Sequence, residues 1–503
     1  MSMPFVNREF TFTQPDGSQL KVRGTGDQHS AVFETLDGYT VVQDPTTGSF
    51  HYARLNDEGD DLVPSGVRPG SASPTSLQLT PNLRPDRLTM RARSLAGSGL
   101  PRSSLSRWQQ RRNERRLSIH TFEATAGAFP APPQRTTVGQ YVGLCLLIQF
   151  PDVAGTIPLD EVKDFCNKPG YTGFGNNGSV RDYFFDNSGG KLTYTNIVAP
   201  YYTAKHRRSY YTNEKIPDGQ RAIELIREAL AYHRSHGFDF SGLTVDNQNM
   251  VYAVNAFYAG PCVNNWPQGL WPHSSHLTTP YQLAPGRYAN DYQITNMGNE
   301  LTLGTFCHEN GHMICDFPDL YSYSNDWYGA GYYCLMCFGG ARPNEKNPAQ
   351  IGAYLKHSAG WTKNEFAIAP GQNVTLRAGQ NEFAIFRKSS TEYFIIENRE
   401  QSGRDTGLTD AGLAVWHVNE SGSNTGSEQV PSLVHECALV QADGNQNLEK
   451  HQNAGDNTDL FRSGLNDRLN DTTTPNAKWL DGTASGLTIS NISAAGPTMS
   501  FTT

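Results

Sequence analysis

The sequence predicts an α+β protein in which a mixed central domain lies between a small β-rich module and a C-terminal β-sandwich. Three observations lead to this prediction. Short strand-like runs separated by turn signals fill both ends of the 503-residue chain, as antiparallel sheets require. The middle of the chain combines apolar runs with amphipathic, helix-like segments. A stretch rich in Pro, Ser, Ala and Arg separates the first module from the middle and is typical of a linker.

The predicted boundaries follow these changes in pattern. We expect a β-rich module over residues 1–70, a linker or activation segment over 71–137, the central domain over 138–364 and the β-sandwich over 365–503. A hydrophobic fraction of 37%, together with 48 glycines, is enough for a sizeable core.

The first module shows the alternation of short strands. Runs at residues 10–12, 20–22 and 39–42 are strand-like. Pro15-Asp16-Gly17 and Asp37-Gly38 lie between such runs and are hairpin signals.

The linker contains five arginines at a helical spacing. Two interpretations are open: an exposed site for proteolytic activation, or a solvated charged helix. The five residues are Arg107, Arg111, Arg112, Arg115 and Arg116.

Three segments of the central domain have a clear pattern. Residues 143–152 are apolar almost throughout and end in Pro-Asp, which predicts a buried strand. Residues 179–192 predict a helix that ends at two glycines. Residues 347–356 predict an amphipathic helix with Ile351 and Leu355 facing inward.

The central domain also contains the pattern His308-Glu309-Asn310-Gly311-His312. Positions four apart lie on one face of a helix, so His308 and His312 can hold one metal ion. Two imidazoles at this spacing suit zinc, and Glu309 can reach a water molecule on the metal. A helix with two surface histidines is the alternative.

A catalytic zinc needs a third protein ligand. Pro318 should end the helix and extend its predecessor, which allows Asp319 to turn back toward the metal. Asp316 competes with it because it lies four residues after His312 on the same face. Either aspartate could instead be a turn residue beside the proline. We favour Asp319.

An apolar run over residues 334–340 stops at paired glycines. Its Met336 can form a soft, adaptable floor beneath a metal site. A methionine without that context is more often core filler.

Together, the motifs between residues 304 and 340 resemble those of the immune inhibitor A family of bacterial zinc metalloproteases, which belong to the metzincin group. The resemblance implies a metzincin-like catalytic domain with zinc on both histidines and Asp319. It also implies that Glu309 is the general base and Met336 the turn methionine. The N-terminal module then resembles the family's prodomain.

Two departures from the metzincin pattern affect the third ligand. A glycine usually follows the second histidine by three residues, where this chain has Cys315. Asp319 also falls eleven residues after His308, one more than the usual spacing.

The resemblance implies a zinc-dependent endopeptidase made as a zymogen, which acts on protein or peptide substrates through zinc-activated water. Two alternatives are open: a zinc exopeptidase or amidase, and a non-catalytic binding protein with a vestigial zinc site. The net charge of −8 argues against general nucleic-acid affinity. Cleavage specificity and oligomeric state cannot be read from the sequence.

The family resemblance and the N-terminal residues lead to different expectations about localisation. The family is mostly secreted, which favours secretion, but residues 1–8 are not followed by the apolar core of a signal peptide. An intracellular enzyme is the alternative. No apolar stretch approaches the length of a membrane span.

His273 lies in a further family-like segment, and we expect it to be a core or wall residue.

Eight cysteines are too few to define a disulfide scaffold in a chain of this length. Four lie near the motif and could form one or two bridges, remain buried thiols or hold a structural zinc: Cys307, Cys315, Cys334 and Cys337.

Loop aspartates in the C-terminal module form a further candidate metal site. Asp443, Asp456 and Asp459 offer the hard oxygen ligands that suit calcium. Solvated loop carboxylates are the alternative.

Overall fold

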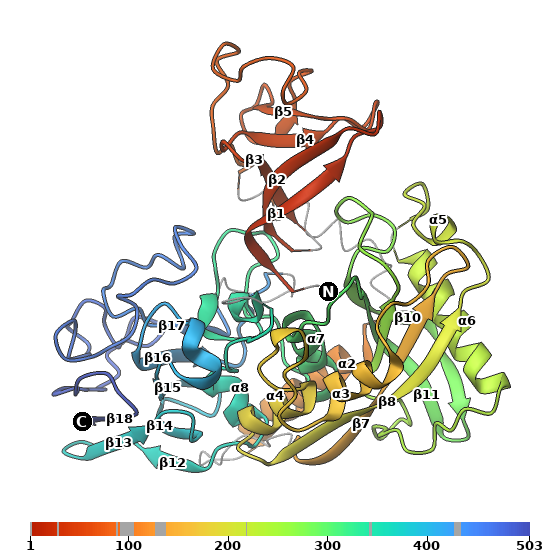
Figure 1. The fold of residues 1–503 in the computed structure, drawn as a ribbon. Helices are drawn as coiled ribbons and strands as arrows, with labels where there is room; N and C mark the ends of the chain where they lie inside the picture. Colours follow the sequence, from red (N-terminus) through yellow and green to blue (C-terminus); the bar gives the residue numbers. More distant parts are fainter. Residues whose placement is uncertain are drawn as a thin grey trace.

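The computed structural model describes residues 3–27, 30–86, 89–90, 105–125, 137–217, 219–341, 345–426 and 434–503. It contains an N-terminal β module, a mixed central module and a C-terminal β module (Figure 1). Within the predicted linker, residues 91–104 and 126–136 lie outside the described residues. None of the helices in the described part of the chain combines the length and apolar character needed to cross a membrane.

The N-terminal module is one antiparallel sheet whose six strands follow chain order. The predicted hairpin over residues 14–18 is present, closed by the Gln14 N–H donating to the Ser18 carbonyl at 2.8 Å. Phe12, Val22 and Phe33 lie in its small core. The strands are β1 (Phe5–Thr13), β2 (Gln19–Gly26), β3 (Ala31–Thr35), β4 (Thr40–Gln43), β5 (Phe50–Leu55) and β6 (Leu62–Pro64).

This module contacts the central module through β1 and a loop. Trp266 packs against the Phe33 ring with centroids 5.6 Å apart. At the other contact, Arg8 forms an ion pair of 2.7 Å with Glu345. The N-terminal sheet therefore lies against the central module.

The central module contains a five-stranded sheet of order β10-β11-β9-β7-β8. All neighbours pair in parallel except β10, which is antiparallel to β11 at the edge. The strands are β7 (Gly139–Gln149), β8 (Leu192–Thr203), β9 (Val254–Tyr258), β10 (His273–Ala284) and β11 (Arg287–Asn296). The helices are α3 (Leu159–Asn167), α4 (Val180–Asn187), α5 (Arg208–Tyr211), α6 (Gln220–Ser235), α7 (Leu303–Cys315) and α8 (Ala353–Ser358).

Both faces of this sheet are covered, which explains why β7 is apolar almost throughout. Cys145 and Leu147 face a core shared with α3, α4 and α7. Leu144 and Leu146 face the opposite core, which α6 covers. The predicted buried strand is therefore confirmed.

The two other predicted helices have different outcomes. The segment from residue 179 forms α4, with Ser179 as its N-cap in a capping box with Asp182. The helix predicted from residue 347 begins only at Ala353. The preceding N–H groups are held outside a helix, because Ile351 N–H donates to the Asn187 side chain at 2.8 Å. Gly352 is extended and ends that loop.

The C-terminal module has a five-stranded sheet of order β12-β14-β15-β16-β17 and a β13–β18 pair. On β15, Phe394 faces the core between these two sheets, whereas the adjacent Tyr393 faces the core that contains α7. The predicted boundary at residue 364 therefore separates elements but not cores. The strands are β12 (Asn364–Ala367), β13 (Asn373–Arg377), β14 (Glu382–Arg387), β15 (Glu392–Arg399), β16 (Gly412–Asn419), β17 (Cys437–Leu439) and β18 (Thr498–Thr502).

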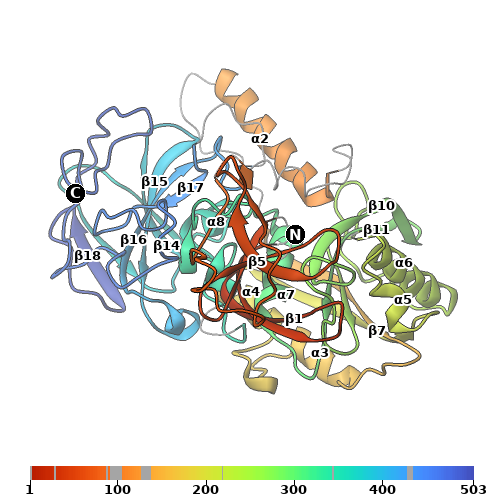
Figure 2. The same ribbon diagram turned by 90° about the horizontal axis from the view of Figure 1, so that it is seen from above.

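One long helix of the linker, α2 (Arg107–Thr125), lies across the molecule. Figure 2 shows it running from the side of β10 and β11 to the side of β15 and β17. It contacts α7 and β11, so the linker helix lies beside the metal-binding motif.

Candidate metal centre

Helix α7 places four polar side chains in an almost fully buried environment. Buried polar groups need partners, and one of the four has them within the sheet. The Asn310 amide donates to Asn255 Oδ1 at 2.8 Å and accepts from the Tyr194 hydroxyl at 2.5 Å. Asn310 therefore anchors the helix to the sheet. His308, Glu309 and His312 remain for other chemistry.

The helix ends one residue later than the metzincin pattern leads us to expect. Cys315 is still helical, and Asp316 adopts the left-handed conformation at φ 56° and ψ 29°. Aspartate tolerates this conformation better than most residues. The sharp turn therefore moves from position 315 to 316, which matches the one-residue shift of Asp319.

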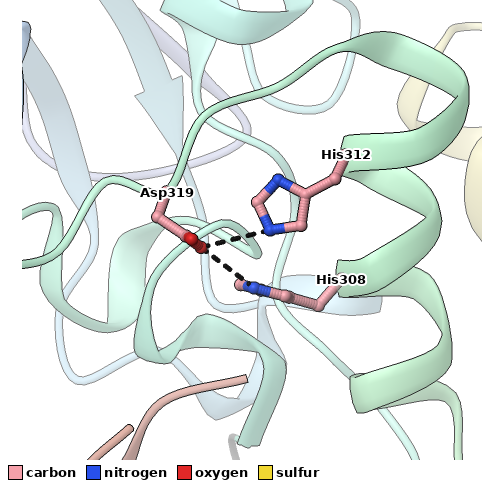
Figure 3. Close-up of side chains that lie close together, drawn as sticks. All are labelled: His308, His312 and Asp319. Atoms are coloured by element: carbon pink, nitrogen blue, oxygen red, sulfur yellow. Dashed lines mark ion pairs between the residues drawn. The ribbon is translucent and has the colours of Figure 1, made fainter. Parts of the chain in front are cut away.

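Three side chains converge beyond this turn (Figure 3). His308 Nε2 lies 3.1 Å from Asp319 Oδ1, and His312 Nε2 lies 3.3 Å from the same oxygen. Tetrahedral zinc with bonds of about 2.0–2.1 Å holds its ligands about 3.3 Å apart. Within the described part of the chain, these residues form the one group of three His, Cys, Asp or Glu whose ligand atoms all lie within 4.8 Å. Asp316 does not belong to it.

Other groups orient each ligand. His308 Nδ1 lies 2.9 Å from the Leu335 carbonyl, and His312 Nδ1 lies 2.6 Å from the Phe317 carbonyl. A proton on each Nδ1 leaves Nε2 free to bind a metal. The Tyr323 hydroxyl donates to Asp319 Oδ2 at 2.6 Å, so Oδ1 is the oxygen that faces the histidines.

The charges of the three groups influence one another. Burial alone would lower the pKa of His308, but the nearby Asp319 and Glu309 carboxylates outweigh it and raise that pKa. Burial alone would raise the pKa of Asp319, but the two imidazoles hold it well below its usual range. The site thus stabilises an ionised carboxylate next to two nitrogen ligands.

Glu309 gives the strongest sign that something is bound here. Its side chain is 1% exposed, and neither carboxylate oxygen has a hydrogen-bond partner among the described residues. Burying an ionised carboxylate without a partner costs on the order of several kcal/mol of folding free energy. A metal ion and its water would supply both charge and a hydrogen-bond donor. The residues present therefore fit a zinc centre.

Met336 lies directly beside the metal helix. A Cβ added to Gly311 would lie 2.6 Å from Met336 Sδ, so a larger residue in the middle of the motif would displace the Met336 side chain. The segment also supports the ligand loop, because the Leu320 N–H donates to the Met336 carbonyl at 2.8 Å. Met336 therefore packs beneath both α7 and the loop that holds Asp319.

Helix α2 covers this site. The Trp108 ring stacks on His312 with centroids 4.7 Å apart and planes 23° apart. The Arg107 and Trp108 N–H groups donate to the two Asp291 oxygens at 2.7 and 2.9 Å, so β11 caps the start of the helix. With α2 in place, His308 and His312 are 0% exposed.

Three of the five linker arginines are buried rather than solvated. Arg107 Nε donates to Asp246 at 2.6 Å, and Arg111 Nε donates to Asp316 at 2.9 Å. Arg112 donates to Glu436 in the C-terminal module. For these three residues the structure contradicts the exposure that both interpretations expected, and proteolytic activation in this segment stays a prediction. Carboxylates from distant parts of the sequence form ion pairs with the three arginines.

The calcium candidates lie near one another without forming a comparable cluster. Thr458 Oγ1 lies 2.9 Å from Asp443 Oδ2 and 2.5 Å from Asp456 Oδ1, within hydrogen-bond distance of both carboxylates. Asp459 Oδ2 accepts from the Asp456 N–H at 2.7 Å. Their ligand atoms do not meet the spacing that the His308, His312 and Asp319 group meets. Calcium at these aspartates stays a prediction.

The remaining candidates have structural positions. All eight cysteines lie in the described part of the chain and are free thiols, so neither of the bridged arrangements is present. Burial raises the pKa of the Cys334 thiol to about 11, which keeps it protonated. His273 is buried, with Nδ1 at 2.7 Å from the Trp271 carbonyl, which agrees with its expected place in a wall.

Neither a scan of protein-family models nor a search of curated proteins found a match to this chain. The family resemblance therefore stays a prediction. Sequence reasoning missed Tyr323, Trp108 and Asp291, which orient or cover the site. The helical spacing of the linker arginines indicated the helix itself, but nothing in the sequence indicated that Trp108 stacks on His312.

Proposed function

We propose that this protein is a zinc-dependent endopeptidase made as a zymogen, with zinc on His308, His312 and Asp319. The observation that carries the proposal is the buried Glu309 carboxylate on the helix of the two histidine ligands, for which the described part of the chain supplies no hydrogen-bond partner. Structural zinc sites are closed by four protein ligands, whereas three ligands and an acid leave room for water.

Zinc bound there supplies Lewis-acid chemistry, which polarises a scissile carbonyl and makes water a nucleophile at neutral pH. Glu309 accepts the proton from that water on its unpartnered carboxylate and delivers it to the leaving amine. Tyr323 keeps the Asp319 carboxylate oriented while this happens. Met336 and the surrounding core exclude bulk water from the far side of α7.

The full chain should be inactive because a substrate cannot reach the metal. A substrate chain must reach the metal, but α2 covers it with Trp108 stacked on His312. Arg107, Arg111 and Arg112 hold the helix down through buried ion pairs. The covered state is therefore the inactive form, and activation displaces α2.

The test is Glu309→Gln in a full chain that also carries Trp108→Ala, which weakens the cover, compared with the Trp108→Ala chain that keeps Glu309. We expect hydrolysis of casein and of a mixed peptide library to fall by about 10²- to 10⁴-fold while bound zinc is retained. Mass spectrometry of the products, with and without a chelator, is the measurement. Glu300→Gln is the matched control, because Glu300 is exposed and forms an ion pair with Lys346 rather than with a residue of the metal centre.

The products also separate the alternatives. Internal cuts that need zinc and Glu309 support an endopeptidase. Release of single terminal residues would indicate an exopeptidase, and activity that survives Glu309→Gln would remove the general-base assignment. Zinc binding without hydrolysis in any background would favour a non-catalytic protein.

A further inference from the structure

Arg111 of α2 lies in a recess built for a guanidinium group. Its Nε donates to Asp316 Oδ1 at 2.9 Å, and its Nη2 donates to the Met313 carbonyl at 2.8 Å. On the other side, Nη1 donates to Asp246 Oδ2 at 3.1 Å. The Tyr252 ring lies 4.7 Å from the guanidinium carbon.

These contacts favour arginine over lysine. Two carboxylates, a carbonyl and an aromatic face surround a planar group with several fixed donors, whereas an ammonium offers one compact charge. The Asp246 and Asp316 side chains are each 2% exposed. When α2 is displaced, Asp246 loses its ion pairs with Arg107 and Arg111, and Asp316 loses its ion pair with Arg111. Removing the cations from two buried carboxylates is costly.

The recess adjoins the metal centre. Asp316 ends α7, and its N–H donates to the His312 carbonyl at 2.9 Å. Trp108 covers His312, and Arg111 follows it by three residues, a rise of about 4.5 Å along a helix. An extended peptide covers that distance in one or two residues, at about 3.3 Å each. A substrate over the metal would therefore place a nearby side chain in the recess.

We propose that Asp246, Tyr252, the Met313 carbonyl and Asp316 form a specificity pocket for a substrate arginine one or two residues from the scissile bond. Arg111 fills this pocket while α2 covers the site. The role of the pocket in substrate selection rests on the proposed function. The pocket itself can be tested by peptide binding alone.

The binding test uses the full chain with Arg107→Ala, Trp108→Ala and Arg111→Ala, which loosens α2 and removes both guanidinium groups that contact Asp246. The probes are a labelled peptide of residues 105–117 and the same peptide with citrulline, the neutral isostere of arginine, at position 111. We expect the arginine peptide to bind about tenfold or more tightly in fluorescence anisotropy, in line with a charged hydrogen-bonded group. Equal affinity, or no binding of either peptide, would overturn the pocket.

Further variants show whether these carboxylates are responsible. Asp316→Asn and, separately, Asp246→Asn should reduce the preference for arginine to less than about threefold. Asparagine tolerates the left-handed backbone of residue 316. If both variants lose the preference for the arginine peptide, a local folding defect at one of the two positions does not explain the result. Asp160→Asn, at an exposed position of α3, is the control and should keep the full preference.

Cleavage of a peptide library by the Trp108→Ala chain separates this inference from the proposed function. Enrichment of arginine within two residues of the cut supports both. Cleavage without that enrichment overturns the pocket and leaves the peptidase standing. Arginine-selective binding without any cleavage overturns the peptidase and leaves the pocket standing.

Discussion

At the scale of single residues, the metal centre depends on Asp319 rather than on its neighbour Asp316. Asp319 Oδ1 faces both imidazoles, whereas Asp316 holds Arg111. Sequence reasoning could favour Asp319 because Pro318 ends the helix, but it could not place the turn at residue 316. That position depends on a left-handed aspartate whose carboxylate is held by a residue more than 200 positions away.

We predict that Asp319→Asn loses tight zinc binding, whereas Asp316→Asn keeps one zinc per chain. A carboxylate ligand is replaced by a weak neutral one in the first variant, and no ligand changes in the second. Metal analysis after dialysis against a weak chelator measures the difference. Zinc retained in the first variant and lost in the second would reverse the assignment.

The same titration should depend on pH. Because the pKa of His308 is raised in the metal-free site, a proton competes with zinc at a higher pH than at an ordinary histidine. Zinc affinity should therefore fall as pH is lowered, and lowering the pH should release zinc from wild type before it unfolds the chain.

At the scale of elements, α2 is the feature that sequence patterns describe least well. Its arginine spacing predicts a helix, and a helix is present. Its polar composition suggests a solvated face, yet it is held by Asp246, Asp291 and Glu436 from three distant segments. Such partners leave no periodic signal. By contrast, the metal helix and the strand β7 follow from local patterns alone.

We predict that Trp108→Ala raises peptidase activity of the uncleaved full chain by about tenfold or more. Removing a buried tryptophan costs about 3–5 kcal/mol, and here the loss falls on the covered state alone. Initial rates on a quenched peptide report the change. Asn113→Ala, at an exposed position of the same helix, should leave the rate unchanged, and an unchanged rate in Trp108→Ala would show that α2 does not control access.

At the scale of the whole molecule, the central and C-terminal modules share one core. Trp361, Tyr393 and Trp416 belong to the same buried cluster as the residues of α7. The predicted division at residue 364 came from a change in strand pattern, which is local. A sheet that is buried on both faces gives no local sign of which face joins a neighbour.

Because the two modules share one core, the ionisation of one buried acid, Asp459, should change the stability of both modules together. Burial raises the pKa of Asp459 to about 7, above its unfolded value, so the stability it contributes is present at low pH and is lost as pH rises from about 4 to 7. We predict that Asp459→Asn removes this loss, making the variant more stable than wild type at pH 8 by on the order of 2–4 kcal/mol. Thermal melting across pH 4–8 is the measurement.

Asp456→Asn is the control, because hydrogen bonds from Thr458 outweigh the effect of burial and lower the pKa of Asp456. That variant should be less stable than wild type at neutral pH. If calcium binds these loops, it should raise the melting temperature of wild type at pH 8 and fail to do so in either variant.

The anchoring of Asn310 has a consequence for how the metal arrives. One face of α7 is tied to the sheet by this amide, and Gly311 leaves no gap above Met336. Rotation of α7 about its axis would break the Asn310 hydrogen bonds and press Gly311 against Met336. These contacts orient the helix that carries both imidazoles without involving an ion, so we expect the metal to exchange without refolding of the chain.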